Sequence, residues 1–118
     1  MKEFLLLVRS EANHWDGMSP EQQQNHILMA GKYIQKLTSE GKLIGAQPLT
    51  MNGLMLQNDN GIFKDGPFVE SKEVIGGFFH IAAKDLAEAV EIAKANPVFD
   101  DSNSRIEIRE IMRAEGIN

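Results

Sequence analysis

The first residue in this sequence that could do chemistry is His26. It lies at the edge of an apolar stripe with helical spacing, and Tyr33 follows seven residues later on the same edge. An imidazole with its ordinary pKa of about 6.5 exchanges protons near neutral pH, so His26 could act as a general acid or base in a cleft. The alternative is a half-buried histidine hydrogen-bonded to a neighbour.

A second group of charged residues surrounds a tight bend. The segment Asp65-Gly66-Pro67 cannot form regular helix, because Gly allows positive φ and Pro lacks an N–H donor. The bend presents Asp65, Lys72 and two glutamates beside an apolar strand. We expect Asp65 and Lys72 to border a small-molecule pocket, with Lys72 attracting an anionic ligand. Alternatively, Asp65 only caps the turn and Lys72 is a solvated surface charge.

The other two histidines carry weaker predictions. His14 lies with Trp15 and Asp16 in a polar loop, which is either a lid or a surface loop, and we expect His80 to be a packed or interface residue on a strand. The three histidines lack short spacing and the chain has no cysteine, so we expect no metal site, thiol nucleophile or disulfide. No Gly-rich phosphate loop precedes a helix, and we predict no cofactor.

Length and composition favour a single globular domain over residues 1–118. The chain is 42% hydrophobic and 25% charged, with a net charge of −5. An acidic chain is poorly suited to nucleic acid, which needs a basic face. The apolar run at residues 4–8 is too short for a signal peptide or a membrane span, so we predict a cytoplasmic protein without membrane contact.

The hydrophobic pattern predicts strands and helices in an α+β order. A helix over 20–40 begins with the capping box Ser19-Pro20-Glu21-Gln22 and ends before Gly41, and a second helix begins after Asp85 and ends before Pro97. The predicted strands cover residues 2–9, 43–49, 53–57, 62–64, 77–82 and 104–110. This order fits a ferredoxin-like sandwich, an antiparallel sheet with two helices on one face.

Two further predictions follow from side-chain alternation. The inner faces of the helices are predicted to be the stripes Ile27, Ala30, Ile34, Leu37 and Leu86, Ala89, Val90, Ala93. Because Phe78 and Phe79 point to opposite faces of their strand, one meets the helices and the other needs a cover. A second subunit is the simplest cover, so we predict a homodimer.

The stretch from Asp65 to Gly77 resembles the signature of the YCII-related family, in its DGPF-type branch. The resemblance extends from Phe4 to about Ile111 and includes the Ser19-Pro20-Glu21 helix start. It implies a ferredoxin-like subunit that dimerises through its sheets into an α+β barrel. Most members have no assigned reaction, although relatives include an enzyme that dehydrochlorinates a chlorinated hydroxyquinol, and a His–Asp pair has been proposed as the active site.

The resemblance also implies site residues. His26 stands at a position similar to that of the family's histidine, whereas Asn96 precedes Pro97 where the family has an aspartate. Asparagine can orient an imidazole but carries no charge to stabilise imidazolium. The implied function is a cofactor-independent enzyme that uses His26 as general acid or base on a small polar or aromatic molecule, with Tyr33 and Asn96 orienting it. The alternatives are a non-catalytic dimeric module that binds or senses a small ligand, and a purely structural dimer.

Overall fold

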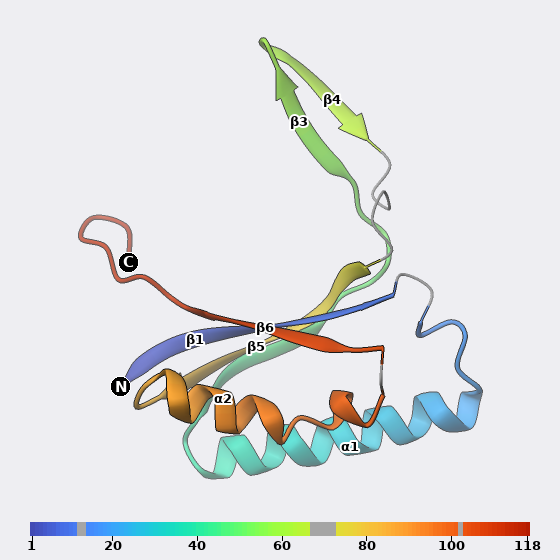
Figure 1. The fold of residues 1–118 in the computed structure, drawn as a ribbon, viewed down its shortest axis with the longest axis vertical. Coiled ribbons are helices and arrows are strands. Elements are labelled where there is room, and N and C mark those ends of the chain that lie inside the picture. Colours follow the sequence, from blue (N-terminus) through green and yellow to red (C-terminus); the bar gives the residue numbers. More distant parts are fainter. Residues whose placement is uncertain (12–13, 67–72, 102) are drawn as a thin grey trace.

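The computed structural model describes residues 1–11, 14–66, 73–101 and 103–118. Its elements follow the predicted order (Figure 1), namely β1 (Lys2–Glu11), α1 (Pro20–Ser39), β2 (Leu43–Pro48), β3 (Met55–Asp59), β4 (Ile62–Gly66), β5 (Glu73–Ala83), α2 (Leu86–Lys94), the 3₁₀ helix η1 (Pro97–Asp100) and β6 (Arg105–Glu110). Among the described residues, no helix combines the length and apolar character needed to cross a membrane.

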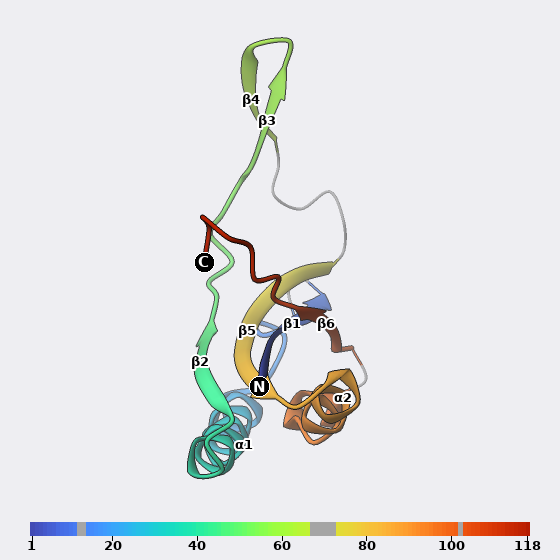
Figure 2. The same cartoon turned by 90° about the vertical axis from the view of Figure 1, so that its left-hand side faces the viewer.

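Four strands form one antiparallel sheet in the order β2-β5-β1-β6. Both long helices lie on one face of this sheet, as Figure 2 shows in end view. The N-terminal strand β1 is therefore central, with Leu6 paired to Phe79 on one side and to Ile108 on the other. This arrangement confirms the predicted α+β class with two helices on one sheet face.

The hydrophobic core lies between the sheet and the helices. Phe4, Leu6 and Ile81 are fully buried, and the Phe79 ring packs edge-on against Tyr33 with centroids 5.4 Å apart. Burial along β1 alternates, since Leu5 and Leu7 are only half-buried on the opposite face. Both helices cover the same face of the sheet, so the other face of β1 is only half-buried within this chain.

The helix boundaries follow the predicted caps. The Gln22 amide donates to Ser19 Oγ at 3.1 Å, and the Ser19 amide donates to Gln22 Oε1 at 2.8 Å, which completes the capping box. Gly41 follows the C-cap with φ of 71°, a conformation that glycine adopts without strain. At the start of α2, Asp85 Oδ1 accepts from the Glu88 amide at 2.9 Å. Local chemistry therefore defines where α1 and α2 begin.

Two predicted inward residues are in fact exposed. Ile27 and Leu86 are each 56% exposed, so the predicted inner stripes are wrong at their first positions. The buried side chains of α1 are Tyr33 and Leu37, and those of α2 are Ala89, Ile92 and Ala93. Ala30, Ile34 and Leu37 remain on the inner side of α1 as predicted, and Tyr33 and the half-buried His26 join them in place of Ile27.

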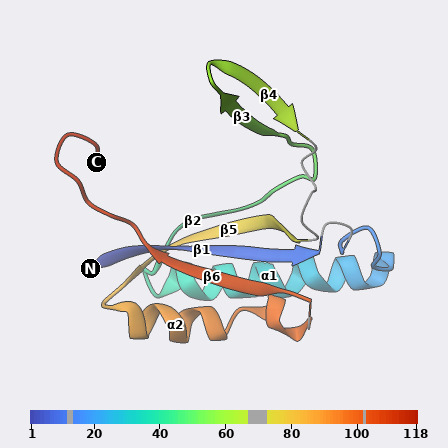
Figure 3. The same cartoon turned by 45° about the horizontal axis from the view of Figure 1, so that its top comes forward.

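The strands β3 and β4 form a separate two-stranded hairpin that projects from the sheet on the side away from the helices (Figure 3). Asn60 and Gly61, both with positive φ, make its two-residue turn, as the Asn-Gly signal predicts. The bend after Gly66 falls in residues 67–72, so the prediction at Lys72 lies outside the described residues.

Candidate functional site

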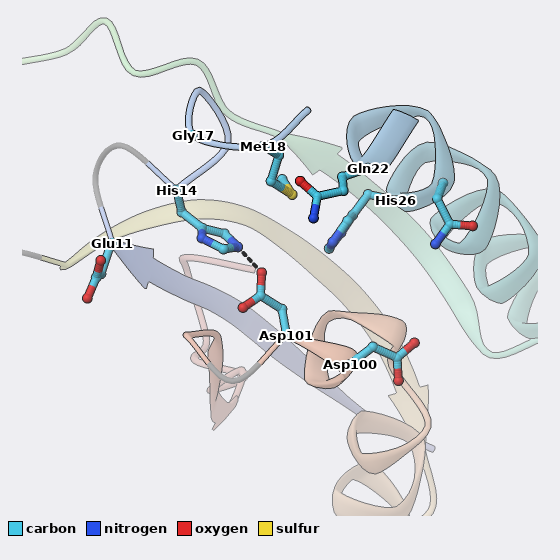
Figure 4. A pocket seen from close by; sticks show the side chains of 9 residues that line it. Glu11, His14, Gly17, Met18, Gln22, His26, Asp100 and Asp101 are labelled. Atoms are coloured by element: carbon cyan, nitrogen blue, oxygen red, sulfur yellow. Dashed lines mark ion pairs between the residues drawn. The ribbon is translucent and has the colours of Figure 1, made fainter. Parts of the chain in front are cut away.

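A hollow of about 660 Å³ lies where the segment after β1, the first turns of α1 and η1 come together (Figure 4). We call it the loop pocket. Its size is within the range of small-molecule sites, about 300–1,000 Å³. Most of the residues that line it are polar or charged: Glu11, His14, Gly17, Met18, Gln22, Asn25, His26, Asp100 and Asp101.

The centre of the loop pocket is a pair formed by His14 and Asp101. Nε2 of His14 lies against Oδ2 of Asp101 without the geometry of a hydrogen bond, and Figure 4 shows the two side chains directed at each other. Both are mostly covered, with 18% and 15% of the side-chain surface exposed. Two backbone turns hold them in place, because the His14 amide donates to Glu11 O at 3.0 Å and the Asp101 amide donates to Val98 O at 3.1 Å.

His26 reaches the same pocket from α1. Gln22, Asn25 and His26 are three and four residues apart, a spacing that places side chains on one helix face. In Figure 4 the Gln22 and His26 side chains extend from α1 toward the His14–Asp101 pair. The half-buried His26 ring makes no hydrogen bond or ion pair within the described part of the chain. Its nitrogens are therefore available to a ligand.

Asn96 does not share a pocket with His26. It is 2% exposed and caps η1, where its Oδ1 accepts from the Val98 amide at 3.0 Å. Among the described residues, Asn96 lines neither the loop pocket nor the groove of about 470 Å³ between α1 and α2. In the loop pocket the carboxylate that faces a histidine is that of Asp101, five positions after Asn96.

Tyr33 lines the groove between the helices rather than the loop pocket. Its hydroxyl donates to Ile92 O at 2.6 Å. Burial raises the pKa of Tyr33 to about 12, and a hydrogen bond from the Asn96 side chain opposes part of that rise. The amide Nδ2 of Asn96 makes no bond of normal geometry within the described residues, so this second contact is weak. Tyr33 therefore joins α1 to α2 as a neutral phenol.

A comparison with protein families places the chain. A family model described as YCII-related domain matches residues 3–115. The chain belongs to the YCII-related domain family. A comparison with curated proteins found no match.

In this YCII-related protein the predicted site residues separate. His26 lines the loop pocket, Tyr33 and Asn96 lie elsewhere, and Asp65 belongs to β4 on the projecting hairpin. The sequence reasoning missed Asp101 and treated His14 as a loop residue. A signal was present, since Asp100 and Asp101 follow the Pro97 turn, but only the fold shows that this turn ends beside the segment after β1.

A second histidine–carboxylate pair lies on the helix-free sheet face of this YCII-related protein. His80 Nε2 is 2.7 Å from Glu3 Oε1, and Arg113 contacts the other Glu3 oxygen. Neither His80 nor Glu3 lines the loop pocket. Within the described ranges no three His, Cys, Asp or Glu residues are grouped as metal ligands would be. The loop pocket is therefore the candidate site for acid–base chemistry.

Proposed function

We propose that this YCII-related protein is a cofactor-independent enzyme that transfers protons on a small polar molecule bound in the loop pocket. The observation that supports it is the His14–Asp101 pair, mostly covered by protein, with a second unpaired imidazole, His26, on the opposite wall. A carboxylate that holds an imidazole in place and stabilises its charged form is a recurring device of general acid–base catalysis.

Each group has a distinct task in this proposal. Asp101 orients His14 through Nε2, and His14 Nδ1, which has no hydrogen bond within the described residues, accepts a proton from a substrate carbon or oxygen. His26 donates a proton at a second position of the substrate, either to a leaving group or to a neighbouring atom. One proton is removed and one is added, so the net reaction is an isomerisation or an elimination.

The charges of the loop pocket favour a neutral or cationic ligand. Glu11, Asp100 and Asp101 contribute three carboxylates, and no lysine or arginine of the described chain is among the lining residues. Carboxylates repel anions and accept hydrogen bonds from hydroxyl and amino groups. We therefore propose a small molecule with hydroxyl or amino groups, which includes hydroxylated aromatics.

Deuterium incorporation tests the proposal without knowledge of the full reaction. The protein is incubated in D₂O with a panel of hydroxylated aromatic and amino-ketone carbon acids, and exchange at carbon is followed by NMR. We expect exchange with the wild type and a decrease of about 10²-fold or more in His14→Asn and Asp101→Asn, on the scale of lost general-base catalysis. His80→Asn is the matched control and should retain exchange.

The panel also separates the proposal from its main alternative. Equal exchange in wild type and His14→Asn would contradict catalysis by this pair. Ligand binding by thermal shift without any exchange would support the alternative, a non-catalytic small-ligand-binding or sensing module.

We further propose that the protein is a homodimer built on the helix-free sheet face. Support comes from Leu5, Leu7 and Phe78, apolar side chains that stay half-buried there while Phe79 fills the core. Phe78→Glu should dissociate the dimer, which sedimentation measures. Assignment to the DGPF-type branch and a cytoplasmic location are also proposals, supported by the Asp65-Gly66-Pro67-Phe68 sequence and by the absence of cysteine.

A further inference from the structure

The hairpin formed by β3 and β4 carries several exposed large apolar side chains. The large apolar side chains of the hairpin and of Leu54, which precedes β3, are each between 58% and 66% exposed: Leu54, Met55, Leu56, Ile62 and Phe63. The hairpin pairs only within itself and is not hydrogen-bonded to the four-stranded sheet. An isolated two-stranded hairpin is marginally stable at best in water. The described residues leave these apolar side chains uncovered, so a further surface packed over them would stabilise the hairpin.

Both faces of the hairpin are apolar in part. Leu56 and Phe63 lie diagonally on one face, because Leu56 is opposite Asp65 and Phe63 is opposite Asn58. Met55 and Ile62 lie on the other face, where an ion pair joins Lys64 and Asp59 at 3.0 Å. A flat surface that covered Leu56 and Phe63 would leave Met55 and Ile62 exposed on the other face. The pattern therefore fits an arm that another subunit contacts on both faces.

We propose that this hairpin is an arm that packs its apolar side chains against a second copy of the chain. The proposal rests on the proposed homodimer and adds the contact that completes it. In all three views the hairpin extends from the sheet on the side away from the helices (Figures 1 and 3). A subunit docked on the helix-free face would therefore lie beside the arm.

The area that a dimer needs favours a second copy as the occupant. Interfaces of standard size take about 800 Å² from each partner. The apolar side chains of the helix-free face include Leu5, Leu7 and Phe78, each already half-covered, and Ile75, which is opposite Arg9 and 36% exposed. A whole aromatic side chain supplies about 150–250 Å². Charged residues border these side chains, with Arg9 bound to Glu107 at 3.4 Å. The five exposed apolar side chains of the arm therefore add area that a dimer on the helix-free face can bury.

Symmetry makes the contact reciprocal. In a two-fold dimer each subunit uses the same surface, so two arms would each reach across to the other subunit. Removing apolar side chains from the arm then affects the interface twice.

The test compares two pairs of substitutions by sedimentation over a micromolar concentration range. Leu56→Ser with Phe63→Ser alters the arm, and Ile27→Ser with Leu28→Ser alters similarly exposed residues on α1. We expect the arm variant to dimerise at least tenfold more weakly and the α1 variant to match the wild type. Circular dichroism checks that both variants are folded. We expect them to be, because all four substituted side chains are exposed.

The outcomes separate the arm from the dimer. A wild type that stays monomeric overturns both proposals. A wild-type dimer that is dissociated by Phe78→Glu but not by the arm variant overturns the arm alone. Weakening by the arm variant with no effect of Phe78→Glu supports the arm and overturns the sheet face as the interface.

Because the chain has no cysteine, a single introduced cysteine gives a second readout. Gln57→Cys on the hairpin, labelled with a short photocrosslinker, should join two chains of the same mass. Lys36→Cys on α1 serves as the control and should not. Crosslinking at neither position, in a sample shown to be dimeric, overturns the proposed arm.

Discussion

The two halves of α1 have different roles, although they belong to one continuous helix. Its first half, around Gln22 and His26, lines the loop pocket, and its apolar Ile27 and Leu28 are exposed. Its second half buries Tyr33 and Leu37 against the sheet and α2. The first half thus contributes polar groups to an open site, and the second half contributes volume to the core.

The difference shows how a helix can present a site without weakening the fold. Tyr33 is fixed by a hydrogen bond to α2 and by the Phe79 ring, so the second half anchors the helix. The first half is then held at a set angle by the anchored half and by its capping box. Substitutions in the two halves should therefore separate stability from function.

The largest stability effect is expected in the anchored half. Leu37→Ala removes a side chain that is 4% exposed and should lower the free energy of unfolding by about 2–5 kcal/mol, the usual cost of such a core cavity. Chemical denaturation measures it. Deuterium exchange per folded molecule should stay near the wild-type value, and a loss of exchange with little loss of stability would contradict the division of α1.

The reverse result is expected for His26→Asn. Its half-buried ring fills no core volume, so the free energy of unfolding should change by less than about 0.5 kcal/mol. Exchange on the same substrates should decrease by about 10²-fold, because the second proton-transfer group is gone. A loss of several kcal/mol of stability instead would make His26 a structural residue.

A smaller effect is expected for Tyr33→Phe, and it depends on pH. Near neutral pH the variant should lose about 1 kcal/mol with the hydrogen bond to Ile92 O. The unfolded chain releases the phenol proton near pH 10, whereas burial raises the pKa of Tyr33 in the folded protein to about 12. Rising pH therefore favours unfolding of the wild type. The greater stability of the wild type over Tyr33→Phe is present below pH 10 and is lost as the pH rises toward 12.

Chemical denaturation at pH 7, 10 and 11 measures the difference in the free energy of unfolding between the wild type and Tyr33→Phe. Because both proteins contain the same lysines, the effect of lysine titration on stability cancels in this difference. Tyr33 is the single tyrosine in the chain, so its absorbance titration can be assigned directly. A constant difference between the two proteins at all three pH values would contradict a raised pKa.

The sequence predicts the fold well because caps and turns are local signals. Ser19, Asp85 and the Asn60-Gly61 turn act through their own neighbours, and each was found where its pattern indicates. The prediction that Ile27 belongs to the inner face of α1 was wrong because it relied on the apolar character of this residue. Which side of α1 is buried depends on how its second half packs on the sheet. Hydrophobicity alone does not carry that information.

The candidate site was only partly predictable for a related reason. His26 is recognisable from its helix, but its neighbours His14 and Asp101 are 87 positions apart and meet only through the sheet topology. Asn96 drew attention by its position before Pro97, and its side chain is used to cap η1. A contact between two loops gives no periodic pattern in the sequence, so only the structure shows that His14 and Asp101 are paired.

The central place of β1 in the sheet has a consequence for the order of folding. β1 precedes all the other strands in the sequence and forms its ladders with β5 and β6, so Phe4 can pair with Ile81 and Glu110 only after those later strands are synthesised. Contacts this distant in sequence slow folding, because a long loop must close before any pairing is gained. During synthesis β1 is thus an apolar strand with two unpaired edges. Helix α1 can form early from its local caps, and we expect it to shield one face of β1 until the C-terminal strand completes the sheet.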